Sequence, residues 1–280
     1  MFHFETPCDI IILAGQSNAE GFGLGECENP YEKDERVLWL GAKIPCYKPI
    51  EENPTVNYLD VKGCLENTVG VAELGERGCF AHYFAREYIK NGFLKEDRKL
   101  MIVNAAVGGT GFVDTFWGLG KSERATGLWT SDGPLYKRMI AQIDDALRLN
   151  PDNKIVGILW HQGENNVNFC DDFSLIEEKS YKWLQNLIHD VKEHYGLQDL
   201  PVVCGEFVKD SWYRERKEGC DVVMKAMEDL MKDIGGGFVK SDGLLSNDQK
   251  VHNGDGIHFC HDSLRVLGER YFEEYAKIVK

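Results

Sequence analysis

The sequence lacks several features that would assign it to particular classes of protein. No apolar run approaches the roughly 20 residues that a membrane-crossing helix requires. Residues 1–8 carry no basic segment, and the apolar stretch behind them is too short for a signal peptide. Basic residues are scarce, because 32 Lys and Arg stand against 46 Asp and Glu, giving a net charge of −14 that disfavours nucleic acid and anionic membranes as partners. We therefore expect a cytoplasmic protein without a membrane or nucleic-acid partner.

Paired cysteine motifs are also missing. The nine cysteines are scattered from Cys8 to Cys260, and no two of them form a C-x-x-C pair. This pattern argues against a zinc knuckle and against a disulfide framework. Reduced, mostly buried thiols in a cytosolic protein are the state that it predicts.

What the sequence does contain is a short apolar run that ends in a polar triplet. Residues 10–14 are rich in β-branched side chains, which is typical of a parallel strand buried on both faces. The run stops at Gly15 and is followed by Gln16, Ser17 and Asn18. Open α/β sheets bind their ligands just beyond the carboxyl ends of such strands, so Ser17 is a candidate nucleophile. The alternative is that Ser17 merely caps the helix that follows.

Apolar runs alternate with stretches of helical periodicity along the rest of the chain. Main strands are predicted over residues 10–14, 37–40, 100–105, 155–160 and 201–207, with a short additional one at 237–240. Helices are predicted over residues 78–91, 133–147, 173–195, 222–231 and 262–279, and irregular loops over 41–76 and 112–132. We therefore predict one domain spanning residues 1–280, a three-layer α/β/α sandwich with a flavodoxin-like, doubly wound parallel sheet of about five strands.

Three polar or glycine-rich clusters each follow a predicted strand directly. They comprise residues 15–18, 108–110 and 162–164. Glycine turns or helix caps explain each cluster by itself. The carboxyl ends of parallel strands share one edge of the sheet, however, so the three clusters together predict one site.

Asp255 and His258 supply a candidate base near the end of the chain. A histidine beside a serine can take its proton, and a carboxylate on the other ring nitrogen holds the tautomer and stabilises the imidazolium. A spacing of three residues lets Asp255 reach His258 within one turn. The alternative is a surface histidine next to a capping aspartate.

These segments together resemble the SGNH (GDSL-like) hydrolase superfamily. Gly15–Asn18, Gly108–Thr110, Trp160–Glu164 and Asp255–His258 occur in the order typical of its sialate O-acetylesterase and acetylxylan esterase branch of carbohydrate esterases. The resemblance extends from residue 10 to about residue 271. The chain departs from it at Gly163–Asn166, where Gly-Glu-Asn-Asn stands in place of the usual Gly-Glu-Ser-Asp.

The resemblance implies a serine esterase that removes acetyl groups from a carbohydrate, whether a small molecule or an oligosaccharide, without a cofactor or metal. It makes Ser17 the nucleophile, His258 the general base and acid, and Asp255 the residue that orients His258.

It also implies an oxyanion hole. The expected donors are the backbone N–H of Ser17, the backbone N–H of Gly108 or Gly109, and the side-chain amide of Gln162. Three further residues are expected to support the nucleophile turn and the Gln162 loop: Gln16, Asn18 and Glu164.

Two other functions remain open from the residues alone. A metal-dependent hydrolase would use ligands drawn from His161, Glu164, Asp255, His258 and His261, although their spacing fits no zinc signature. A flavodoxin-like binding module without catalytic activity would hold a phosphate on the glycine-rich run at residues 108–111, which lacks a G-x-G-x-x-G pattern and a Walker lysine.

Two tryptophans lie in the predicted loop over residues 112–132. Trp117 and Trp129 would offer stacking surfaces for sugar rings, and core packing is the alternative for each.

Overall fold

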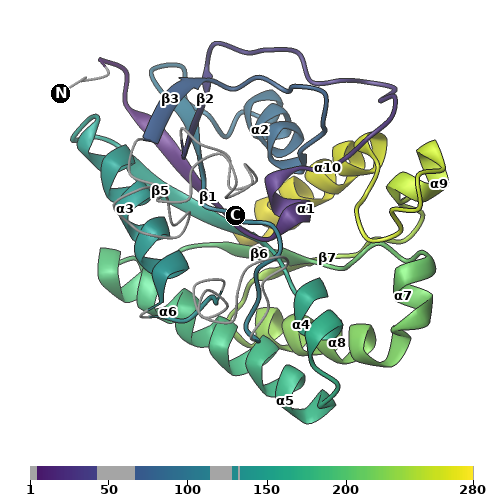
Figure 1. The fold of residues 1–280 in the computed structure, drawn as a ribbon. Helices are drawn as coiled ribbons and strands as arrows, with labels where there is room; N and C mark the ends of the chain where they lie inside the picture. Colours follow the sequence, from purple (N-terminus) through teal and green to yellow (C-terminus); the bar gives the residue numbers. More distant parts are fainter. Residues whose placement is uncertain (1–4, 43–66, 114–127, 132, 280) are drawn as a thin grey trace, which may run out of the picture.

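A computed structural model describes residues 5–42, 67–113, 128–131 and 133–279. In this part of the chain, seven strands form one sheet in the order β3-β2-β4-β1-β5-β6-β7, with helices on both faces (Figure 1). The strands are β1 (Cys8–Gly15), β2 (Val37–Ala42), β3 (Asn67–Val71), β4 (Lys99–Asn104), β5 (Lys154–His161), β6 (Val202–Gly205) and β7 (Gly237–Val239). Every neighbouring pair is parallel except β2 and β3. The predicted three-layer α/β/α architecture is therefore confirmed.

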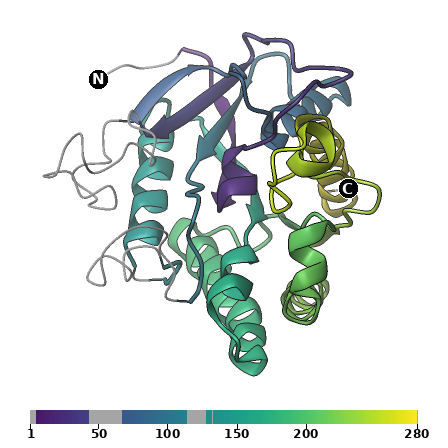
Figure 2. The ribbon, with the colours of Figure 1, turned by 45° about the vertical axis from the view of Figure 1, so that its right-hand side comes forward.

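The long helices are divided between the two faces of the sheet (Figures 1 and 2). α2 (Phe80–Lys90) and α10 (His261–Ile278) pack together on one face. α3 (Pro134–Arg148), α6 (Leu184–Tyr195) and α8 (Lys217–Asp233) cover the other face. The remaining helical segments are α1 (Ser17–Glu20), α4 (Glu164–Phe169), α5 (Phe173–Glu178), the π-helical turn η3 (Lys179–Trp183), α7 (Ser211–Glu215) and α9 (Asn247–Val251).

Strand β1 occupies the centre of the sheet and is buried along its whole length. Its side chains alternate between the two faces, as the period of a strand requires. Ile10 and Ile12 enter the core beneath α3, α6 and α8, whereas Ile11 and Leu13 enter the core beneath α2 and α10. A continuous apolar run thus fills two separate cores, which is why it contains no polar residue.

The strand count is where the sequence-based prediction is wrong, because the sheet has seven strands and not about five. The added strand β3 lies inside the stretch over residues 41–76 that was predicted to be irregular; residues 43–66 of that stretch are outside the described residues. β3 pairs only with β2, in antiparallel fashion, so it is not buried like a central strand and has no apolar run to reveal it. The short strand predicted at 237–240 is found at Gly237–Val239.

The predicted helix over residues 173–195 is present but changes its hydrogen-bonding pattern midway. α5, η3 and α6 follow one another without a break, and η3 has π-helical geometry. A π-turn inserts one residue into a helix and shifts the face that is buried beyond it. The short helices α4, α7 and α9 were not predicted, because five or six residues are too few to show a helical period.

Two expectations from composition can be compared with the structure. The seven cysteines in the described ranges are all free thiols, and five of them are buried. Burial raises the pKa of the Cys79 thiol to about 12, so this sulfur stays protonated. None of the described helices is long and apolar enough to span a bilayer.

The ends of the central strands meet where the sequence places its polar clusters. Gly15 at the end of β1 pairs with His161 at the end of β5. A Cβ atom on Gly15 would lie only 2.1 Å from the His161 carbonyl oxygen, and its φ of 127° favours glycine. Beyond β4, the Val107 N–H donates to the Gly15 carbonyl at 3.0 Å. The clusters at 15–18, 108–110 and 162–164 therefore lie at one edge of the sheet, as predicted.

The contact between α2 and α10 depends on a glycine and yields a test of the fold. A Cβ atom on Gly268 would lie 2.2 Å from the Phe80 carbonyl oxygen and 2.8 Å from the Tyr83 Cβ. We expect Gly268→Ala to lower the free energy of unfolding by about 1–3 kcal/mol, because the backbone of α2 has to move. Urea denaturation measures this loss. The control Glu273→Ala, at an exposed position of the same helix, should change stability by less than about 0.5 kcal/mol. Equal stability of the two variants would contradict the close packing.

Candidate active site

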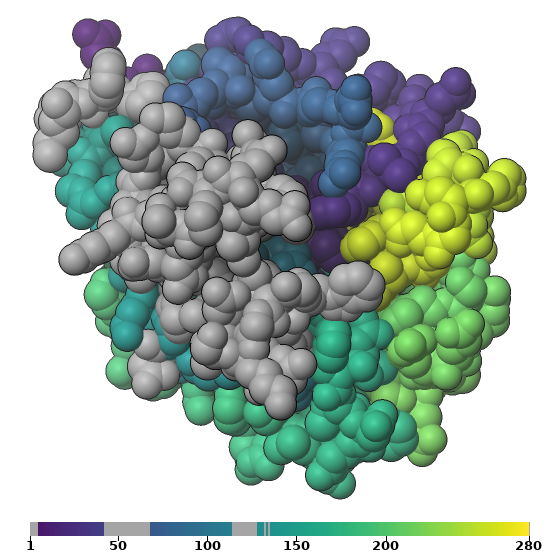
Figure 3. All heavy atoms as spheres, in the orientation of Figure 1, coloured from purple at the N-terminus to yellow at the C-terminus, as the bar shows by residue number. Residues whose placement is uncertain are grey.

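Ser17 is the first residue of α1 and is 7% exposed. Its hydroxyl is not used to cap the helix, because the N-cap is Gln16 and makes no side-chain cap. Ser17 Oγ lies 2.8 Å from Nε2 of His258, a residue 241 positions later in the chain. The interpretation of Ser17 as a helix cap is therefore wrong. Figure 3 shows a hollow in this face of the molecule, between the N-terminal part in purple and the C-terminal part in yellow.

Asp255 and His258 lie in the loop that joins α9 to α10. His258 Nδ1 is 2.9 Å from Asp255 Oδ2 and 3.0 Å from Oδ1, and the backbone N–H of His258 also donates to Oδ1 at 3.2 Å. Partial burial acts to raise the pKa of Asp255, but the hydrogen bonds from His258 and its charge lower it more, to about 2. The Asp255 carboxylate is therefore ionised at any pH near neutrality. It accepts a hydrogen bond from the protonated Nδ1 of His258, while Nε2 of the same ring faces Ser17.

The Asn18 side chain holds the loop on both sides of His258. Its Nδ2 donates to the carbonyl of Ile257 at 3.1 Å, and its Oδ1 accepts the N–H of Phe259 at 3.1 Å. The second hydrogen of Nδ2 is donated to Glu164 Oε1 at 2.7 Å. Asn18 is completely buried and follows Ser17 directly, so one side chain links the serine to both neighbours of the histidine.

Glu164 is buried with no exposed surface beneath Asn18. Burial raises the pKa of Glu164, and the hydrogen bond from Asn18 opposes that rise. His161, whose Nε2 is 3.7 Å from Glu164 Oε1, is equally buried, and burial lowers its pKa to about 3. Its Nδ1 is hydrogen-bonded to the Tyr271 hydroxyl at 2.9 Å. A neutral imidazole and a buried carboxyl group therefore face each other. The pair lies in the protein interior, away from the Ser17 hydroxyl.

Gln16 ties the serine turn to the start of α4. Its Oε1 accepts the N–H groups of Gly163 at 3.4 Å and Asn165 at 3.3 Å, and the amide of Gln162 at 3.3 Å. Gln16 is 1% exposed. The side chain therefore braces the two loops against each other.

The expected oxyanion donors differ in the hydrogen bonds that they already donate within the protein. The Gln162 amide is 1% exposed, and its Nε2 also makes long contacts with Thr110 O at 3.5 Å and Asn166 Oδ1 at 3.3 Å. The N–H of Gly108 donates to Glu20 Oε2 at 2.9 Å. Ser17 stands at the start of α1, where the first N–H groups have no partner inside the helix. A carboxylate thus holds one of the donors that the sequence predicted.

Asn247 is part of the site, and the sequence analysis did not single it out. The residue is fully buried at the start of α9. Its Nδ2 donates to Asp255 Oδ2 and to the carbonyl of Phe22, both at 2.9 Å, and its Oδ1 accepts the N–H of Leu24 at 2.8 Å. Its backbone N–H donates to the His258 carbonyl at 2.8 Å. Only the Ser246–Gln249 capping box marks this position in the sequence, and it predicts a helix start and no link to Asp255.

The five residues of the metal hypothesis do not converge on one point. His161 bonds Tyr271 in the core, and His261 Nε2 bonds the Tyr83 hydroxyl at 2.8 Å, so neither faces His258. Within the described ranges, no three His, Cys, Asp or Glu side chains are placed to hold one ion.

The glycine-rich turn of the phosphate-binding hypothesis already holds a carboxylate. Glu20 accepts the Gly108 N–H there.

The prediction that Trp129 offers a stacking surface for sugar rings is wrong. Trp129 is fully buried against Trp160, and its Nε1 donates to Thr110 Oγ1 at 2.9 Å. Trp117 lies outside the described residues.

The α/β architecture described above is shared with proteins of known structure. Solved structures with this architecture include NanS, which matches with a TM-score of 0.72 at 18% identity over 98% of both chains. A family profile described as carbohydrate esterase, sialic acid-specific acetylesterase, matches residues 7–277. The chain belongs to this family, and it is a carbohydrate acetylesterase, a carboxylic ester hydrolase.

Two curated relatives match most of the chain at low identity. A probable 9-O-acetyl-N-acetylneuraminic acid deacetylase of Escherichia coli is 23% identical over 227 residues, which cover 73% of this chain and 67% of the relative. A probable carbohydrate esterase of Arabidopsis thaliana is 23% identical over 261 residues, covering 89% of this chain and 88% of the relative. The resemblance stated from the sequence motifs is thereby confirmed at the level of the family.

Asn247 generates a prediction about the charge of Asp255. In Asn247→Ala we expect the pKa of Asp255 to rise from about 2 toward the ordinary value of 3.8, because one hydrogen bond to the carboxylate is lost. A lowered pKa gives stability that is present above pH 4 and is lost as the pH falls through 2. As the pH falls, Asn247→Ala should therefore lose this stability at a higher pH than the wild type. NMR titration of labelled Asp carboxyl carbons and urea denaturation between pH 2 and 5 measure both effects. Asn91→Ala, at the exposed end of α2, is the control, and an unchanged Asp255 titration in Asn247→Ala would refute the assignment.

Proposed function

We propose that this acetylesterase works as a serine hydrolase, forming an acyl-enzyme on Ser17 with His258 and Asp255 completing a triad. The observation that supports this most directly is the continuous chain from Ser17 Oγ to His258 Nε2 at 2.8 Å and from His258 Nδ1 to Asp255 Oδ2 at 2.9 Å. A serine, a base within hydrogen-bond reach and a group that orients the base are the parts that nucleophilic catalysis requires.

The reaction then runs in two halves. His258 Nε2 takes the hydroxyl proton as Ser17 Oγ attacks the acetyl carbonyl carbon, and it returns that proton to the sugar oxygen as the ester bond breaks. A water molecule next attacks the acetyl-Ser17 ester with the same assistance, releasing acetate. The ionised Asp255 stabilises the imidazolium in both halves, since its pKa of about 2 keeps it charged.

The proposed oxyanion donors are the N–H of Ser17 and the amide of Gln162. Donors that are fixed before the reaction stabilise the developing negative charge without reorganisation. The Gly108 N–H can join them only after the Glu20 carboxylate has moved away, because that carboxylate accepts it in this structure. Gly109, the next residue of the turn, has a φ of 74° and is the alternative backbone donor.

Substitutions of Ser17 and His258 test the proposed triad. Hydrolysis of p-nitrophenyl acetate should fall by roughly 10⁴-fold or more in kcat for Ser17→Ala and for His258→Ala, because these residues act as one unit. The activity of the wild type should persist in EDTA, since every proton and electron pair in the proposed steps belongs to side chains, substrate and water. Ser174→Ala, at an exposed serine of α5, serves as the control and should retain full activity.

A Ser17→Ala enzyme with near-normal turnover would remove Ser17 as the nucleophile. Loss of wild-type activity on chelation, restored by added metal, would favour the metal-dependent alternative. Circular dichroism of each variant must show the wild-type fold for these results to count.

A substitution of Gln162 tests the proposed oxyanion hole. Gln162→Ala should lower kcat by roughly 10²–10³-fold with little change in KM, because the lost hydrogen bond forms mainly in the transition state. Gln198→Ala, at an exposed position after α6, is the matched control. A change confined to KM would instead make Gln162 a binding residue.

A further inference from the structure

A buried asparagine in α4, Asn166, lies between the two segments that carry the proposed oxyanion donors. Its side chain has no exposed surface. Its Oδ1 accepts the backbone N–H of Phe112 at 2.8 Å and the side-chain amide of Gln162 at 3.3 Å. Phe112 follows the glycine-rich turn that contains Gly108, so one oxygen contacts both segments. The proposed reaction steps do not involve Asn166.

The N–H of Phe112 decides which way the Asn166 amide points. A backbone N–H can only donate a hydrogen bond, so the atom that faces it must be the amide oxygen. The nitrogen, Nδ2, then faces the hydroxyl of Ser180 at 3.4 Å, which can accept. The two ends of an amide differ in their hydrogen bonding, and here a backbone group selects between them.

The orientation of Asn166 is passed on to Gln162. Three oxygens surround one end of the Gln162 amide: Asn166 Oδ1 and Gln16 Oε1, each at 3.3 Å, and the Thr110 carbonyl at 3.5 Å. Gln16 Oε1 is itself fixed as an acceptor by two backbone N–H groups of the Gln162 loop. Only an NH₂ group can face three acceptors. The surroundings therefore fix Nε2, and not Oε1, at this end.

The Gln162 amide is held in place but not used up. Its two hydrogens serve three acceptors, and each distance is longer than the roughly 2.7–3.2 Å of an ordinary N–H···O bond. A negatively charged oxygen forms shorter and stronger hydrogen bonds than a neutral one. An oxyanion can therefore take one of these hydrogens while the neighbouring oxygens keep the nitrogen in place.

The π-helical turn η3 supports this arrangement from outside. Ser180, the partner of Asn166 Nδ2, belongs to η3 and is 1% exposed. The residue before it, Lys179, donates from Nζ to the Phe112 carbonyl at 3.0 Å. Two consecutive residues of η3 thus hold Asn166 and its anchor Phe112. π-turns are rare and are frequent at functional sites, and this one serves the oxyanion side of the candidate site.

We propose that Asn166 is a positioning residue for the acetylesterase reaction, anchored by the Phe112 N–H and acting through the Gln162 amide. Its hydrogen bonds go to Phe112, Gln162 and Ser180, so it orients a donor and is not one itself. The inference rests on the proposed function in taking Gln162 as an oxyanion donor.

Kinetics with p-nitrophenyl acetate test this role. Asn166→Ala should lower kcat by about tenfold with little change in KM, because a displaced donor stabilises mainly the transition state less well. The loss should be smaller than in Gln162→Ala, since Gln16 and Thr110 still hold Nε2. Asn166→Asp, which restores the usual residue of the motif and keeps an oxygen at this place, should retain kcat within about threefold. Asn186→Ala, at an exposed position of α6, is the control and should be unchanged.

A double-mutant cycle shows whether Asn166 acts through Gln162. In the Gln162→Ala background, Asn166→Ala should lower kcat by less than about twofold, because the group that it positions is gone. A tenfold loss in both backgrounds, a loss confined to KM, or full activity of Asn166→Ala would overturn the proposal. If circular dichroism shows that Asn166→Ala is unfolded, Asn166→Thr replaces it, because threonine has a similar volume and its oxygen is attached one bond closer to the backbone.

Nuclear magnetic resonance separates this inference from the proposed function. The side-chain NH₂ signals of Gln162, assigned by their absence in Gln162→Ala, should shift in Asn166→Ala. The Phe112 amide hydrogen should exchange with D₂O at least about tenfold faster in that variant, since it loses its partner, and should stay protected in Asn166→Asp. Unchanged Gln162 signals and Phe112 exchange in Asn166→Ala would refute the positioning role. A wild type without esterase activity would instead refute the proposed function, and these spectra would still decide whether Asn166 holds Gln162.

Discussion

The geometry of the site depends on the side-chain amide of Asn18 more than on any other single group. Its hydrogen bonds reach Glu164 in α4 across 146 residues of chain, and Ile257 and Phe259, the two neighbours of His258, across 239 and 241 residues. The amide is fully buried, so water cannot replace a lost partner, and an unsatisfied group there would cost about 1–3 kcal/mol. The distance between Ser17 Oγ and His258 Nε2 is therefore fixed by a neighbour of the serine, and not by the serine itself.

Three acidic side chains in and beside the candidate site illustrate how environment decides charge. Asp255 gathers hydrogen bonds from His258 and Asn247 and has a pKa of about 2. Glu164 receives one hydrogen bond in a fully buried position, and burial raises its pKa. Glu20 accepts a backbone N–H from the glycine-rich turn. One carboxylate thus stays charged beside the histidine, a second is buried as a structural partner, and the third holds the turn.

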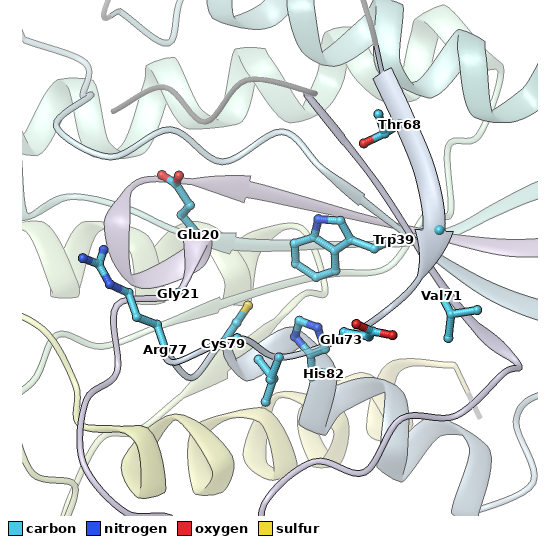
Figure 4. A pocket seen from close by; sticks show the side chains of 12 residues that line it. Glu20, Gly21, Trp39, Thr68, Val71, Glu73, Arg77, Cys79 and His82 are labelled. Atoms are coloured by element: carbon cyan, nitrogen blue, oxygen red, sulfur yellow. The ribbon is translucent and has the colours of Figure 1, made fainter. Parts of the chain in front are cut away.

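The candidate site and the neighbouring pocket lie over different parts of the sheet. Ser17 and the Gln162 loop follow the central strands β1 and β5, whose pairing brings Gly15 next to His161. A pocket of about 380 Å³, lined among others by Trp39, Thr68 and Arg77, extends toward the edge strands β2 and β3 and toward α2 (Figure 4). Central strands tolerate little change because both of their faces are buried, whereas an edge strand has a free side.

The sequence by itself determined the layers, the central strands and the family. Continuous apolar runs such as residues 10–14 reveal strands that are buried on both faces, and the order of the short motifs predicted that Ser17, Asp255 and His258 share one edge. Only the tertiary structure decided the edge strand β3, the role of Asn247 and the partner of Gly108. An edge strand lacks the apolar signal of a buried one, and hydrogen bonds between residues far apart in sequence leave no local pattern.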